Sequence, residues 1–89
     1  MVHGIDIEFV FVLHDHILAD LEKKQKKGWW YATSILAKEL DVSPQQVGQS
    51  LSWMEKQTCS HYEGRHLRRL RVERWSKTRG STKWRVERL

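Results

Sequence analysis

The chain has 89 residues, of which 39% are hydrophobic and 30% are charged, with five glycines and one proline. These proportions favour a single globular domain over residues 1–89 and argue against a fibrous repeat or wholesale disorder. No apolar run reaches the roughly 18–20 residues that a membrane-spanning helix needs, so we expect no membrane partner and no signal peptide. The lone Cys59 cannot form an internal disulfide, which favours a cytoplasmic protein.

Positive charge is concentrated in the second half of the chain. Residues 1–43 hold five Lys and Arg against seven Asp and Glu, whereas residues 44–89 hold eleven against four. The two halves therefore carry net charges of −2 and +7, which add up to the +5 of the whole chain. A surface that faces phosphates requires such an excess, although a solvated basic surface would give the same count.

Residues 1–28 predict an N-terminal helix from about Asp6 to Lys26. Its apolar residues recur at helical spacing, namely Val10, Leu13, Ile17, Leu18 and Leu21. The lysines of residues 23–27 complement a helix C-terminus, and Gly28 follows as the expected stop. Further apolar residues exceed what one short helix needs to bury: Ile5, Phe9, Phe11 and Val12. Either a homodimer forms through this helix, or the core is larger and includes the tryptophans.

Residues 33–57 predict two short helices joined by a tight turn. The first begins after Thr33 and carries a narrow apolar stripe of Leu36, Ala37 and Leu40. The second starts at Pro44, because Ser43 is a suitable N-cap, proline suits the first helical position, and Gln46 can close a capping box.

This segment resembles the helix-turn-helix of winged-helix DNA-binding proteins, the broad class that includes the MarR-like and ArsR-like regulators. The resemblance rests on a small residue, a serine and a set of core aliphatic residues: Ala37, Ser43, Leu36, Leu40, Val42, Val47 and Leu51. Many members have glycine in the turn where this chain has Asp41, a residue that tolerates the left-handed backbone better than most. The resemblance implies an α+β winged helix-turn-helix fold, with about three helices and a C-terminal β-hairpin wing.

Two other segments fit the strands of such a fold. Residues 29–32 are short and aromatic and can form a small first strand. Residues 67–89 predict the wing hairpin, because apolar and polar residues alternate on both sides of a polar loop at residues 78–82; the apolar members are Leu70, Val72, Trp84 and Val86. Between Gln57 and Leu67 no periodicity is clear, so a helix extension and an irregular loop are equally open.

The second predicted helix has a polar side suited to the major groove of DNA. At about 100° per residue, an apolar cluster of Val47, Leu51 and Met54 lies opposite a polar cluster of Gln45, Gln49, Ser52 and Lys56. Glutamine can read an adenine edge, and serine and lysine can reach bases or phosphates. The flanking residues are Gln46, Ser50 and Trp53. Helix capping by Gln46 and cover of the core edge by Trp53 are the structural alternatives, and Gly48 is expected to permit close helix packing.

The predicted wing supplies the second half of the proposed DNA surface, through Lys77, Arg79, Ser81, Thr82 and Lys83. Arginine is electrostatically favoured in a narrow minor groove, so we expect Arg79 there. Lys77 and Lys83 would then clamp phosphates.

Metal binding and catalysis have little support in the sequence. His14 and His16 would lie about 200° apart on a helix, and the group Cys59, His61 and His66 lacks the paired spacing of a zinc site. No phosphate-binding glycine motif or nucleophile elbow is present. We therefore expect no enzymatic activity, no metal and no cofactor.

The sequence thus predicts a protein that binds double-stranded DNA, as a small transcriptional regulator. One alternative is a winged-helix protein-interaction module in transcription or replication machinery. Another is binding to structured RNA, where the basic hairpin would recognise backbone shape. Fold resemblance alone does not separate these functions.

Overall fold

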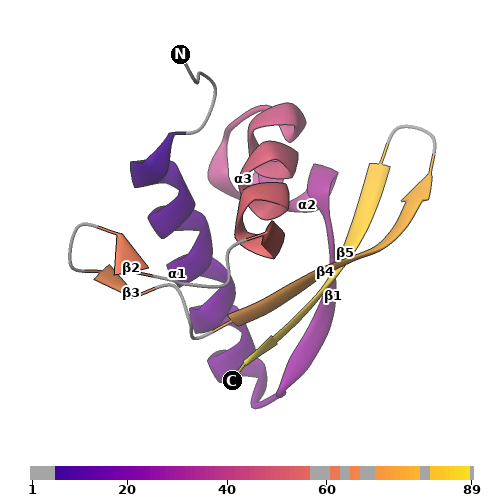
Figure 1. Ribbon diagram of the computed structural model, residues 1–89. Coiled ribbons are helices and arrows are strands. Elements are labelled where there is room, and N and C mark those ends of the chain that lie inside the picture. Colours follow the sequence, from indigo (N-terminus) through magenta and orange to yellow (C-terminus); the bar gives the residue numbers. More distant parts are fainter. Residues whose placement is uncertain (1–5, 57–60, 63–64, 67–69, 79–80, 89) are drawn as a thin grey trace.

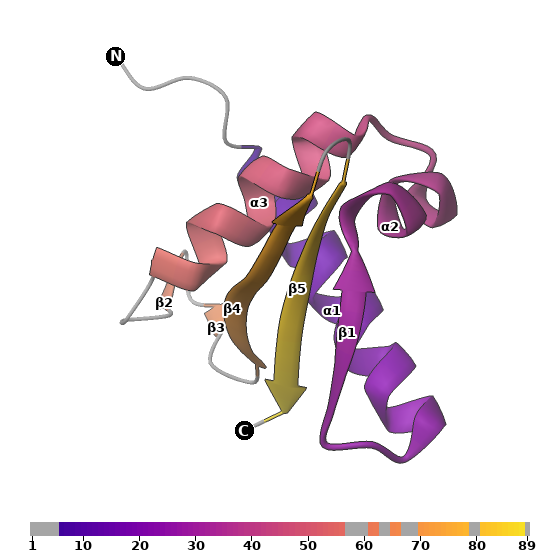
Figure 2. The same cartoon turned by 90° about the vertical axis from the view of Figure 1, so that its right-hand side faces the viewer.

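The structure is a computed structural model that describes residues 6–56, 61–62, 65–66, 70–78 and 81–88. Its elements are, in chain order, α1 (Ile7–Lys24), β1 (Gly28–Ala32), α2 (Thr33–Leu40), α3 (Pro44–Lys56), β2 (His61–Tyr62), β3 (Arg65–His66), β4 (Leu70–Thr78) and β5 (Ser81–Arg88). The strands β1, β5 and β4 form an antiparallel sheet in that order, and the three helices lie on one side of it (Figures 1 and 2). This is the predicted α+β winged-helix arrangement.

Helix α1 begins and ends close to the predicted residues, but its stop signal differs. Asp6 is the N-cap, and its carboxylate accepts a hydrogen bond from the backbone N–H of Phe9 at 3.1 Å. The helix ends at Gln25, which adopts the left-handed conformation with φ 56°. Gly28 is therefore not the stop but the first residue of β1, where an added Cβ would lie 2.8 Å from side-chain atoms of β5.

The turn between α2 and α3 forms as the sequence predicts. Asp41 has φ 56°, which is the left-handed conformation that glycine would otherwise supply. The next residue, Val42, donates its backbone N–H to the carbonyl of Ala37 at 3.0 Å and closes the end of α2. Ser43 Oγ then accepts the backbone N–H of Gln46 at 3.1 Å, which confirms the serine cap of α3.

The core lies between the helices and the inner face of the sheet. Its most buried aliphatic and aromatic members are Val10, Leu13, Ile17, Leu21, Leu36, Val47, Leu51, Trp84 and Val86. Phe9 and Phe11 also belong to this core, at 8% and 6% exposure, whereas Val12 is 53% exposed. The two phenylalanines are thus used inside one chain, so they no longer support a dimer through α1. Ile5 lies outside the described residues.

The two faces of the sheet differ in character. Residues in register share a face, so Tyr31, Trp84 and Arg74 lie together on the inner side, while Trp30 and Arg85 share the outer side. The inner members Tyr31 and Trp84 are buried, but Trp30 is not. The β4–β5 register shifts between Arg74 and Ser76, which marks a bulge at the tryptophan between them.

The segment between Gln57 and Leu67 is neither of the two expected forms where the structure describes it. Instead, β2 and β3 pair as a small antiparallel sheet, with His61 opposite His66 and Tyr62 opposite Arg65. Strands of two residues are too short to show an alternating pattern, which explains why periodicity does not reveal them.

Candidate nucleic-acid interface

Helix α3 divides into the two sides that its sequence predicts. Val47, Leu51 and Met54 are buried, and they anchor the helix in the core. Three members of the polar set are exposed, namely Gln45, Gln49 and Lys56, while Ser52 is half-buried. A polar stripe along about three turns of helix can therefore meet a partner without disturbing the packing of the domain.

The flanking residues of α3 are more buried than a DNA-binding surface requires. Ser50 is buried at 2% exposure, so its assignment to the binding surface is wrong. Gln46 and Trp53 are half-buried, and Trp53 packs against the core. A Cβ added at Gly48 would meet Thr33 Cγ2 at 3.8 Å, which is ordinary van der Waals contact, so close packing does not require glycine there.

Of the five predicted wing residues, the structure describes the side chains of Thr82 and Lys83. Lys83 is exposed and lies two residues before Arg85 on β5, so it shares the outer face of the sheet with Arg85 and Trp30. Thr82 is half-buried. Lys77 and Ser81 lie on β4 and β5, with their side chains outside the described part, and Arg79 lies outside the described residues.

Arg74 is a cation beside α3 that the predicted site omits. Its backbone N–H donates to Glu55 Oε2 at 2.8 Å, which ties the middle of β4 to the last turn of α3. Its guanidinium carbon lies 5.0 Å from the centroid of the Trp84 ring, and the side chain is exposed. The alternation of β4 predicts this position, because it puts Arg74 on the same side as Leu70 and Val72.

Thr33 joins the helix-turn-helix to the hairpin. Its hydroxyl donates to the backbone carbonyl of Thr82 at 2.9 Å and accepts the indole N–H of Trp84 at 3.1 Å. Thr33 and Trp84 are buried at 6% and 1% exposure. Since Thr33 is the first residue of α2, this pair of hydrogen bonds fixes β5 relative to the two helices that follow.

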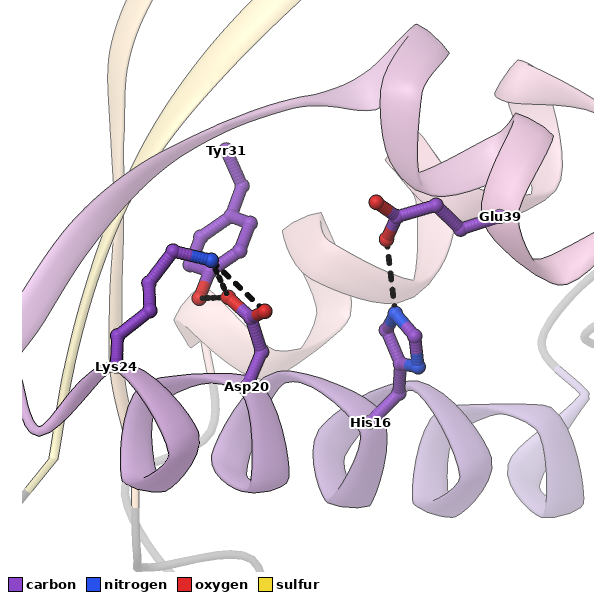
Figure 3. A network of polar contacts seen from close by, with 5 residues as sticks. All are labelled: His16, Asp20, Lys24, Tyr31 and Glu39. Carbon is purple, nitrogen blue, oxygen red and sulfur yellow. Dashed lines mark hydrogen bonds and ion pairs between the residues drawn. The ribbon is translucent and has the colours of Figure 1, made fainter.

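A polar network on α1 ties this helix to β1 and to the last turn of α2 (Figure 3). Tyr31 donates its hydroxyl to Asp20 at 2.5 Å, Lys24 donates to both carboxylate oxygens at 2.8 and 2.6 Å, and His16 Nε2 lies 2.9 Å from Glu39 Oε1. Partial burial alone would raise the pKa of Asp20, but the hydrogen bonds from Lys24 and Tyr31 bring it below its usual value. Burial and the Asp20 carboxylate raise the pKa of Tyr31 far above its ordinary value.

Comparison with known proteins assigns the chain to a family. A family model described as a domain of unknown function, DUF7123, matches residues 13–88. The chain belongs to the DUF7123 family. The match runs from the second turn of α1 to the end of β5, so the helix-turn-helix and the hairpin fall within the DUF7123 unit. No curated protein and no solved structure matches the chain.

The titratable residues of this DUF7123 chain offer little besides the polar network. His14 is buried and His16 is half-exposed, so the two histidines lie on different sides of α1 as expected. In the described part, no group of three or more His, Cys, Asp and Glu is arranged to hold a metal, and no helix there is long and apolar enough to cross a membrane. The side chains of Cys59, His61 and His66 lie outside the description.

Proposed function

We propose that this DUF7123 chain binds double-stranded DNA, with α3 in the major groove and the β4–β5 hairpin against the neighbouring backbone. The division of α3 carries the proposal, because the side opposite its core contacts presents Gln45, Gln49 and Lys56 to solvent. Side chains of these types can read an adenine edge and contact guanine or phosphate. A small transcriptional regulator is the role that such binding would serve.

Charge around α3 supports the same proposal. The acidic residue of α3, Glu55, already accepts a hydrogen bond from the backbone of β4, and the exposed cations Lys56 and Arg74 lie on the helix side of the sheet. The net charge of +7 in residues 44–89 belongs to the part of the chain that contains α3 and the hairpin. Cations gathered beside a polar helix attract phosphates and steer a duplex toward that side.

The first test compares partners and sequence preference. Fluorescence anisotropy with labelled duplex DNA, single strands and RNA, each titrated at several salt concentrations, should give the tightest binding to duplex DNA. Replacing Gln45 and Gln49 by alanine should change the ranking of duplex sequences by roughly 5- to 150-fold per lost bidentate contact, which corresponds to about 1–3 kcal/mol. An unchanged ranking in the folded double variant would refute base reading by α3.

The second test concerns the cations. Lys56→Ala and Arg74→Ala should each weaken binding to all duplexes alike and reduce the slope of log K against log salt by about 0.9 per lost phosphate contact. Lys23→Ala is the charge-matched control, because Lys23 is exposed on α1 and outside the proposed surface. Equal slope changes in all three variants would mean that net charge, rather than this surface, governs binding.

A further inference from the structure

The outer face of the three-stranded sheet exposes a pair of tryptophans. Trp30 and Trp75 are 48% and 62% exposed, although large aromatic side chains are rarely left in water without a role. Their ring centroids are 6.1 Å apart with the planes at 77°, and the guanidinium carbon of Arg85 lies 4.3 Å from the centroid of Trp30. The helices lie behind the sheet, so no described element covers this face (Figure 2).

The bulge in β4 explains how the two rings meet. Trp30 is in register with Arg85 on the central strand β5, so Trp75 must reach across β5 from the other edge strand. As the extra residue between Arg74 and Ser76, Trp75 has no partner of its own in the register. Bulges re-aim single side chains in this way, and here the result is a joined aromatic surface over the middle of the sheet.

The charges around these rings are already paired within the chain. Arg71 Nε lies 3.1 Å from Glu73 Oε1, and Arg85 Nη2 lies 3.4 Å from Glu87 Oε2. Lys83 adds one exposed cation, so the described charges of the face sum to only +1 in a chain of net charge +5. Neutralised pairs around exposed tryptophans suit the desolvated centre of a protein interface better than a phosphate-binding surface.

We propose that the occupant of this face is a second copy of the chain, packed sheet against sheet about a two-fold axis. The strands β4 and β5 each carry an arginine and a glutamate on this face, namely Arg71 and Glu73 on β4 and Arg85 and Glu87 on β5. A copy related by a two-fold axis can therefore place its glutamates opposite the arginines of the first copy, and its arginines opposite the glutamates. The face is smaller than a standard interface: nine residues of β4 span about 30 Å and three strands span about 14 Å, or about 400 Å² in plan, so we expect a weak, reversible dimer.

This dimer differs from one through α1, whose Phe9 and Phe11 are buried, and it does not depend on DNA binding. Sedimentation equilibrium of the full chain without DNA should show a reversible change from the 10.7 kDa monomer to twice that mass. Trp75→Ala and Trp30→Ala should each raise the dimer dissociation constant at least about tenfold, as expected for central aromatic residues. Val12→Ala is the matched control, because Val12 is as exposed but lies on α1.

A second measurement needs no variant, so it holds even where a tryptophan variant unfolds. The tryptophan emission of the wild-type chain should move to shorter wavelength over the same concentration range as the mass change. A monomer at every soluble concentration would overturn the proposal, and so would a dimer that both tryptophan variants leave unchanged. Binding of a single-stranded oligonucleotide to the monomer that is lost in Trp75→Ala would assign the face to nucleic acid instead.

Discussion

Thr33→Val is the sharpest test of how the hairpin is held on the helix-turn-helix. Valine keeps the shape of threonine but removes the hydroxyl that bonds Thr82 and Trp84. The indole N–H of Trp84, at 1% residue exposure, would then be buried without a partner, which costs about 1–3 kcal/mol, and the lost bond to Thr82 adds about 0.5–1.5 kcal/mol. We expect a total loss of about 1.5–4.5 kcal/mol in the free energy of unfolding.

Urea unfolding followed by circular dichroism measures this loss directly. For a domain of this size, it corresponds to a fall in Tm of the order of 10–20 °C. Thr33→Ser is the matched control, because it keeps the hydroxyl and removes one methyl group, worth about 0.8 kcal/mol or less. A Thr33→Val chain within about 0.5 kcal/mol of wild type, or one no less stable than Thr33→Ser, would refute the role of the hydroxyl.

Three further predictions concern stability. Hydrogen bonds hold the pKa of Asp20 low against the effect of burial, so stability should fall below about pH 4, where this carboxylate is protonated. Burial and Asp20 raise the pKa of Tyr31, so stability should fall again above about pH 10. Urea unfolding across pH should show both losses, and a Tyr31→Phe chain that keeps the alkaline loss would contradict this. Gly48→Ala should raise stability by up to about 1 kcal/mol in a thermal melt, because the added Cβ has room; a lower Tm would count against that space. His14→Leu should stabilise the chain by about 1 kcal/mol, since His14 Nε2 is buried without a hydrogen-bond partner in the described part and the Nδ1 contact at 3.1 Å is to the exposed Asp15; a loss of more than that in urea would indicate a partner for Nε2.

Local patterns in the sequence predict most of the fold. Helical spacing and caps locate α1, α2 and α3 to within about two residues, because an N-cap such as Ser43 and a left-handed residue such as Asp41 act through neighbouring backbone groups. The alternation of apolar and polar residues locates β4 and β5, because it too is a pattern among neighbouring residues. The left-handed cap of α1 at Gln25 was not predicted, since glycine is the usual residue at that position and glutamine gives no such signal.

The candidate site is less predictable because it depends on contacts between distant residues. The bond between Thr33 and Trp84 spans 51 residues and has no local pattern. The bulge at Trp75 likewise follows from the pairing of two strands rather than from either alone. Ser50 could have been placed correctly from the helical spacing. It follows Val47 by three residues, or about 300° of rotation, and therefore lies close to Val47 on the apolar side of α3.

An NMR titration of the isotope-labelled chain with duplex DNA tests the central proposal most directly. Our account predicts chemical-shift changes for the backbone amides of α3, for the side-chain amides of Gln45 and Gln49, and for Arg74. The indole signals of Trp30 and Trp75 should stay unchanged, because these rings lie on the opposite face of the sheet from the helices. Shifts confined to the two indoles, or no shifts at all at low salt, would contradict DNA binding through α3.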